Sequence, residues 1–312
     1  MSVNNNSPLR ARNLNELITR FVLGADTINQ GLMRIIPNQQ KEHIIQRFTT
    51  LPNMLEAPVA TPTVPNDSMT KDEISLFVGD HMFYDEFNPL RDFEDDFVEN
   101  WASGGLTDAQ LSKNIRAAIL ETVVDSVQDN IENITWNGDS ASPNVWLQRT
   151  DGLIKLIEND VTVNVAAPVG VIDSANILDI LTSVKNAQRP ELLKGKFKDM
   201  KFMVSYEDFQ ILMDAYRDKD IFKGINIMEG DVPTFAGIPV YSCGIPKDKI
   251  VLTIASGAKN SNLVASTWMW SDTKGVKIDR LAANSELFFA KVLLMFGVSH
   301  VTGEDIAYYK PV

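Results

Sequence analysis

The longest regular hydrophobic pattern in the chain predicts a single long helix over residues 107–134. Apolar residues recur every four positions, and two more widen the stripe: Leu111, Ile115, Ile119, Val123, Val127 and Ile131, with Leu120 and Val124. Thr107 and Gln110 form a capping box at its start, and the turn Trp136–Asp139 is expected to end it. A spacing of four is typical of a helix that lies across a sheet. A coiled coil is the less favoured alternative, because its apolar spacings alternate between three and four.

After Asn159 the pattern changes to short apolar runs that alternate with amphipathic segments. Strands are predicted at 161–165, 201–205, 238–242, 250–254, 263–268, 276–280 and 287–301. Helices are predicted from Ser174, as a cap, through Val184, and over 206–216. The predicted fold class is therefore α+β with one dominant helix, and residues 173–255 form a compact subdomain between stretches of another.

Residues 50–89 leave no room for a helix of useful length. Five prolines interrupt this stretch: Pro52, Pro58, Pro62, Pro65 and Pro89. The sequence between them predicts a long extended or hairpin excursion. Such an excursion is uncommon inside a compact domain unless it has a partner to lie on, so it indicates assembly.

Charge divides the chain into two parts. The 312 residues carry a formal net charge of −12, which argues against sequence-independent nucleic-acid binding. Residues 1–50 carry +3 and the remainder −15, which is typical of a separable basic arm on an acidic body. Leu14, Leu17, Ile18 and Phe21 would share one face of a helix over 14–22; an ordinary surface helix is the alternative.

Membrane insertion and secretion are not expected. The most apolar stretch, residues 287–298, is interrupted by Lys291 and is shorter than the roughly 20 residues that a bilayer requires. The N-terminus shows no signal-peptide pattern. A single cysteine excludes an internal disulfide framework and a zinc site built from cysteine alone.

No catalytic chemistry is evident in the sequence. There is no nucleophile elbow, phosphate-binding loop or dinucleotide fingerprint. Cys243 ends a predicted strand and is expected to be an inert buried thiol, since only His43, His81 and His300 could serve as its base. His300 is expected to be an ordinary strand histidine. We therefore predict no enzyme activity, no catalytic or cofactor-binding residue, and no cofactor.

Two charged clusters remain. The acidic one comprises Asp85, Glu86, Asp92, Glu94, Asp95, Asp96 and Glu99. It lacks the ligand order of a calcium loop, so no metal site is predicted. The cluster is expected to be either a solvated acidic face or a patch that meets a basic surface of another chain. The basic cluster comprises Lys185, Arg189, Lys194, Lys196, Lys198 and Lys201. It could supply the basic surface that meets the acidic patch, or it could be a solvated loop.

Short segments in three places, together with the order and spacing of the predicted elements, carry a resemblance to a known family. The segments are Ile134–Asp139 followed by Thr150–Leu153, then Phe202–Phe209, Phe235–Val240 and Lys259–Val264. The first two are similar to the W-x-G turn and the G-L-L-type segment that follow the spine helix in that family. The next two are similar to stretches of its axial domain, and the last is similar to the segment that crosses back from the axial domain to the peripheral domain. The chain thus resembles the major capsid proteins of tailed bacteriophages, which have the Hong Kong 97-type fold.

The resemblance implies a division of the chain. An N-terminal arm would cover residues 1–50, an extended E-loop 51–95, and a peripheral domain 96–172 with the spine helix at 107–134. An axial domain would cover 173–255, and 256–312 would return to the peripheral domain. Some members crosslink a Lys to an Asn, but no local pattern assigns such a pair here.

The resemblance also implies a function and partners. The chain would assemble with copies of itself, in hexamers and pentamers, into the icosahedral head of a tailed phage. That head would enclose double-stranded DNA without sequence-specific binding. Because residues 1–50 are too few for a fused scaffolding domain, a separate scaffolding protein, or none, is implied; the portal and decoration proteins would be further partners. The chain would reside in the virion after assembly in the host bacterial cytoplasm. An encapsulin-like compartment shell, and less favourably a soluble hydrolase, are the alternatives.

Overall fold

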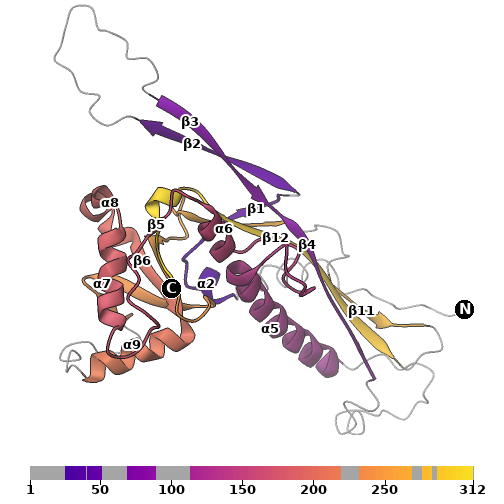
Figure 1. Cartoon of the computed structure of the whole chain (residues 1–312). Coiled ribbons are helices and arrows are strands. Elements are labelled where there is room, and N and C mark those ends of the chain that lie inside the picture. Colours follow the sequence, from indigo (N-terminus) through magenta and orange to yellow (C-terminus); the bar gives the residue numbers. More distant parts are fainter. Residues whose placement is uncertain are drawn as a thin grey trace, which may run out of the picture.

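The computed structural model describes residues 25–39, 41–50, 69–88, 113–218, 232–268, 276–282 and 287–311. These form two packed sheets with their helices and a two-stranded ribbon that projects from the body (Figure 1). The predicted α+β class is confirmed. Among the described residues no helix is long and apolar enough to span a membrane.

A five-stranded sheet forms the first part of the body. Its order is β1-β10-β12-β11, with β4 also pairing with β12. The strands are β1 (Arg34–Pro37), β4 (Gly79–Phe87), β10 (Leu263–Trp268), β11 (Val276–Arg280) and β12 (Phe288–His300). Along β12 buried and half-buried residues alternate from Phe288 to Phe296, which is the pattern of a strand with one face on the core.

The long helix α5 (Lys113–Asn137) covers the inner face of this sheet. Val123, Val127 and Ile131 of the predicted stripe are buried with Val292 and Phe296 of β12 in one core, which confirms the helix-on-sheet prediction for this part of the stripe. The predicted cap at Thr107 lies outside the described residues, as do the side chains of Ile115 and Ile119. The helix ends at Asn137 rather than Ile134 because Trp136, expected in the turn, is fully buried within the last helical turn.

A six-stranded sheet forms the second part, in the order β5-β13-β9-β6-β8-β7. Its strands are β5 (Asn164–Val165), β6 (Met200–Ser205), β7 (Thr234–Phe235), β8 (Ile238–Cys243), β9 (Ile250–Ile254) and β13 (Ala307–Tyr309). The helices α7 (Ile177–Ala187), α8 (Pro190–Gly195) and α9 (Tyr206–Asp218) share a second core with one face of the sheet. The other face contributes Met203, Val251 and Tyr308 to the first core.

Three details differ from the sequence-based expectations. Only 164–165 of the predicted strand 161–165 pair, because just two residues of β13 lie opposite. Ser174 does not cap α7: the side chain of Asp173 accepts hydrogen bonds from the N–H groups of Ala175 and Asn176 instead. The last strand, β13, lies in the six-stranded sheet, although residues 256–312 were expected in the other part.

The projecting ribbon consists of β2 (Glu42–Thr50) and β3 (Met69–Phe77), paired antiparallel. β2 comes from the segment expected to be the arm and β3 from the segment expected to be the E-loop. β4, also within the expected E-loop, is instead part of the body because it pairs along β12. The short helix α2 (Asp26–Asn29) packs in the first core, whereas the predicted helix over 14–22 lies outside the described residues.

Candidate functional site

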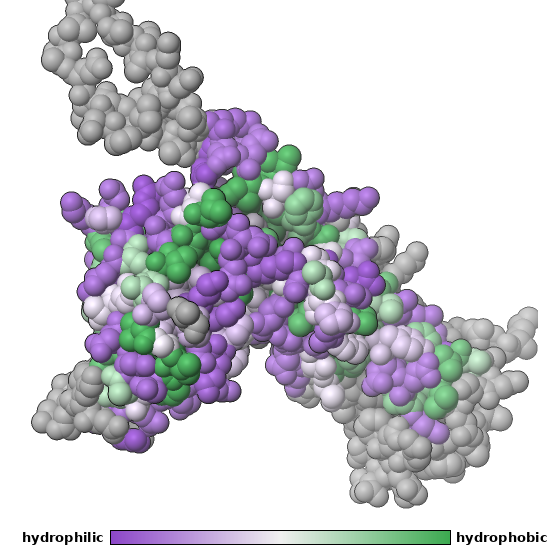
Figure 2. Space-filling model, in the orientation of Figure 1, coloured by the Kyte–Doolittle hydropathy of each residue, from purple (hydrophilic) through white to green (hydrophobic). Residues whose placement is uncertain are grey.

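The ribbon has two unlike faces. Leu76 is fully buried, and Arg47 donates from Nη1 to the carbonyl oxygen of Val301 across 3.3 Å while pairing with Asp72, so this face rests on the body. On the other face Ile44 and Phe77 are 50% and 64% exposed. Hydrophobic side chains are visible where the ribbon meets the body (Figure 2). The register places Glu42, Gln46 and Glu73 on this same face, so two exposed apolar side chains lie among polar ones. Exposed apolar side chains rimmed by polar ones on a projecting ribbon are typical of a surface that binds another chain.

The base of the ribbon is fixed by close backbone crossings. A Cβ atom at Gly297 would lie 1.9 Å from the carbonyl oxygen of Phe77, so only glycine allows β12 to pass beneath β3 here. Gly79 is also closely approached: a Cβ atom there would lie 2.6 Å from Cγ2 of Thr150 and 2.7 Å from the carbonyl oxygen of Arg149. The backbone N–H of Val78 also donates to the carbonyl oxygen of Lys41, at 2.8 Å. The ribbon therefore leaves the body in a defined direction.

The face of the five-stranded sheet turned away from α5 also exposes apolar side chains. Met82 and Tyr84 of β4 are 56% and 44% exposed. The ring of Tyr84 stacks on Phe289 with 5.9 Å between centroids, and the ammonium group of Lys277 lies 5.4 Å from the Phe289 centroid. This face is thus a second candidate contact surface, on which the aromatic rings lie beside charged side chains of both signs, Lys277 and Glu86.

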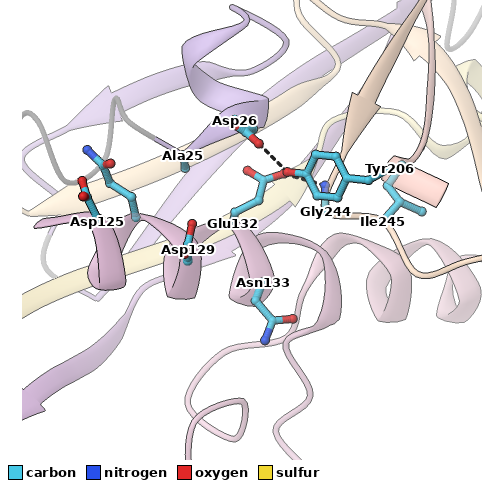
Figure 3. A pocket seen from close by; sticks show the side chains of 10 residues that line it. Ala25, Asp26, Asp125, Asp129, Glu132, Asn133, Tyr206, Gly244 and Ile245 are labelled. Atoms are coloured by element: carbon cyan, nitrogen blue, oxygen red, sulfur yellow. Dashed lines mark hydrogen bonds between the residues drawn. The ribbon is translucent and has the colours of Figure 1, made fainter. Parts of the chain in front are cut away.

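A pocket of about 490 Å³ lies between α5, α2 and the start of α9 (Figure 3). Asp26, Asp125, Asp129 and Glu132 contribute to its lining. The hydroxyl of Tyr206 donates to Asp26 across 2.5 Å. Burial, followed by this hydrogen bond, raises the pKa of Tyr206.

Glu132 also lines this pocket, is 5% exposed, and is a structural junction rather than a catalytic acid. Its carboxylate accepts from the backbone N–H and hydroxyl of Thr27, at 2.9 and 2.5 Å, and from the backbone N–H of Gly244, at 2.8 Å. The indole N–H of Trp136 donates to the same carboxylate at 3.1 Å. Four donors from three segments occupy its oxygens, so little acceptor capacity remains for a substrate. Nothing in the sequence distinguished Glu132 from the other helix carboxylates.

Cys243, the candidate nucleophile, and His300, one of its three possible bases, have different surroundings. Cys243 is fully buried, and this burial, followed by the nearby charge of Glu132, raises its pKa well above the usual thiol range. A thiol of raised pKa is a poor nucleophile. His300 is buried and places Nε2 2.8 Å from Oδ2 of Asp160, where it ties β12 to the end of α6 (Leu153–Asn159).

Of the predicted acidic cluster, only Asp85 and Glu86 lie within the described residues; Asp92, Glu94, Asp95, Asp96 and Glu99 do not. Among the described residues no group of histidine, cysteine and carboxylate side chains is arranged to hold a metal ion. The basic run divides. Arg189 pairs with Glu304 at 2.7 Å, Lys201 lies 4.9 Å from the centroid of the Tyr241 ring, and Lys194, Lys196 and Lys198 are exposed.

No family model and no curated protein matches the sequence. Solved structures match in fold. A chain from the satellite phage P4 procapsid that includes the size determination protein Sid is 13% identical, with a TM-score of 0.56, over 95% of this chain and 90% of that one. A chain from the capsid of the Myoviridae phage XM1 is 10% identical, with a TM-score of 0.58, over 92% of each. A chain from the capsid of the empty GTA particle is 10% identical, with a TM-score of 0.55, over 92% of this chain and 96% of that one.

Proposed function

We propose that this chain, which has the fold of phage capsid chains, is the major capsid protein of a tailed double-stranded DNA phage. Its activity is self-association into an icosahedral head. The observation that carries the proposal is the ribbon β2–β3. It extends beyond the body (Figure 1) and exposes Ile44 and Phe77 on the face turned away from that body. In an assembled shell, a neighbouring subunit would cover this face and bury its apolar side chains.

The strand pairing refines the proposed division of the chain into Hong Kong 97-type parts. The E-loop would begin at Glu42 and end near Val78, because β2 and β3 pair along their whole length. α5 would be the spine helix, and it and the five-stranded sheet would form the peripheral domain. The axial domain would contain the six-stranded sheet, which includes the last described strand, β13.

In the assembled head, the E-loop of one subunit would lie across the exposed sheet face of the next, near Met82 and Tyr84. Copies would form hexamers and pentamers around the DNA, without reading its sequence. A separate scaffolding protein, the portal and decoration proteins are the proposed further partners. The head would assemble in the host cytoplasm and become part of the virion. The role is structural. It agrees with Glu132, whose carboxylate accepts hydrogen bonds from its own chain, and with the buried thiol of Cys243.

Electron microscopy of the expressed full chain, alone and with a scaffolding protein, tests this proposal. Regular shells that contain nucleic acid are the expected result. Shells that instead enclose a protein cargo would favour the encapsulin-like alternative. Sedimentation that shows only monomers or dimers at every salt and protein concentration, with scaffolding protein supplied, would contradict both, and a small closed oligomer would point to the hydrolase alternative.

A further inference from the structure

One edge of the six-stranded sheet lacks the charges that usually protect such edges. Among the described strands β5 pairs only with β13, on one of its two sides. Between Asp160 and Asp173 the chain carries no charged residue. Four valines of this stretch are exposed, by 98, 60, 46 and 62%: Val161, Val165, Val169 and Val171. Natural sheet edges of this kind are normally blocked by charge or covered by another chain.

The exposed stretch is held in place by side chains from other elements. Ser183 of α7 donates its hydroxyl to the carbonyl oxygen of Ala167 at 3.0 Å. The hydroxyl of Tyr309 accepts from the backbone N–H groups of Val169 and Gly170, at 3.2 and 2.9 Å. Asp248 accepts from the N–H of Ile172 at 2.9 Å. The valines are therefore presented on an ordered backbone, which lowers the conformational entropy lost on binding.

A groove of about 580 Å³ runs beside this edge, between residues 165–167 and α7. Its lining is mostly small and polar: Ala167, Thr182, Ser183, Asn186 and Ala187. Asp179 contributes a carboxylate to the same wall, and Asp173 lies at the end of the valine stretch. The β5 edge is thus an apolar strip with a negative border.

The opposite edge of the same sheet has the complementary character. Among the described strands β7 pairs only with β8, and the carbonyl oxygen of Thr234 accepts a hydrogen bond from the hydroxyl of Tyr216 at 3.1 Å. Residues 232–246 carry no charge, and Val232 and Thr234 are exposed. Beside this edge the ring of Phe197 packs on the β7–β8 turn, since a Cβ atom at Gly237 would lie 3.2 Å from it. Lys196 and Lys198, which flank Phe197, are exposed, so this uncharged edge has a positive border.

We propose that the β5 edge of one copy receives the β7 edge of the next copy, with Lys196 and Lys198 facing the groove that contains Asp179. This inference rests on the proposed function and identifies the two surfaces by which copies join in a capsomer. The two surfaces are different and lie at opposite ends of one sheet. Contacts of this head-to-tail type close into rings when the rotation between copies is right.

Disulfide trapping in assembled full-length protein tests the pairing of the two edges. The chain has one native cysteine, Cys243, and it is buried, so background crosslinking is low. The double variant Val165→Cys/Thr234→Cys, mildly oxidised, should give a ladder of covalent oligomers on a non-reducing gel. We expect at least ten times more crosslinked chain than in the control pair Val145→Cys/Thr234→Cys, whose first site is exposed and lies in the connection between α5 and α6.

Shells that form without a ladder above this control would overturn the inference and leave the proposed function intact. A wild-type chain that forms no shells would overturn both. Charge variants test the pairing independently of cysteine chemistry. Asp179→Lys should reduce shell yield several-fold, and adding Lys196→Asp and Lys198→Asp should restore it, whereas Asp214→Lys on the exposed face of α9 should assemble as wild type. Normal assembly of Asp179→Lys, or no rescue by the lysine changes, would overturn the inference.

Discussion

The backbone N–H of Gly152 donates to the carbonyl oxygen of Gly138 across 2.8 Å. This bond joins the turn after α5 to the start of α6. A Cβ atom at Gly152 would lie 2.5 Å from the nitrogen of Gly138, and one at Gly138 would lie 2.5 Å from the carbonyl oxygen of Thr150. The two segments that carry the clearest resemblance in the sequence are therefore in direct contact, with no room for a side chain between them.

Gly152→Ala should destabilise the subunit by about 1 to 3 kcal/mol, because the added methyl group overlaps backbone atoms that cannot move independently. Thermal unfolding followed by circular dichroism measures the effect. Gly257→Ala is the matched control, since nothing lies within 4 Å of its Cβ position. Equal melting temperatures for the two variants would show that the crossing is not tight.

Ile131→Ala should cost about 2 to 5 kcal/mol, because Ile131 is 1% exposed in the core between α5 and the five-stranded sheet. Asp129→Ala on the exposed face of the same helix should change stability by less than about 0.5 kcal/mol. Urea unfolding of both variants gives the comparison. A similar small effect for both would mean that the apolar stripe does not face the core.

Glu132→Gln should destabilise the subunit by about 1 to 3 kcal/mol, because donors face both carboxylate oxygens and the NH2 group that replaces one of these oxygens cannot accept a hydrogen bond. Asp129→Asn makes the same chemical change at an exposed position on the same helix and serves as the control. Urea unfolding distinguishes them. If Glu132→Gln were as stable as this control, Glu132 would not be the junction described.

The stability of the subunit should fall as the pH is lowered from about 6.5 towards 4. Burial lowers the pKa of His81 from 6.5 to about 4, so the unfolded chain binds a proton in this interval that the folded chain does not. Protonation therefore favours unfolding, and the contribution of His81 is fully retained above its unfolded pKa. Melting temperatures at pH 7 and pH 5 should differ less for His81→Gln than for wild type. An equal difference would assign the pH dependence to other groups.

The parts of the fold that the sequence predicted are those in which one local pattern decides the structure. The stripe Val123, Val127 and Ile131 repeats at helical spacing, and the strands 250–254 and 263–268 are short apolar runs with the predicted bounds. Local periodicity is sufficient where one face is buried. The end of α5 was misjudged because Trp136, next to a turn signal, is held in the helix by distant partners, including the hydroxyl of Thr27.

The candidate surfaces depend on contacts between residues far apart in the chain, which periodicity does not reveal. Arg47 reaches Val301, and Glu132 collects donors from Thr27 and Gly244. The exposure of Val165 and Val171 is equally invisible in the sequence, where an apolar strand is expected to be buried. A sheet edge is defined only when the pairing order is known.

The central claim is that the ribbon β2–β3 serves neighbouring subunits rather than its own body. The test is to replace residues 48–71 with Asn-Gly, which keeps the Arg47–Asp72 pair and the buried Leu76 and closes the ribbon with a two-residue turn. Circular dichroism and electron microscopy are applied to this one variant.

We expect a cooperative thermal transition close to that of wild type, since loop shortening changes closure entropy only modestly. We also expect that no regular shells form, because the outer part of the ribbon is removed from the intersubunit contact, although Ile44 and Phe77 remain. A variant that fails to fold, or one that still assembles into regular shells, would contradict this account.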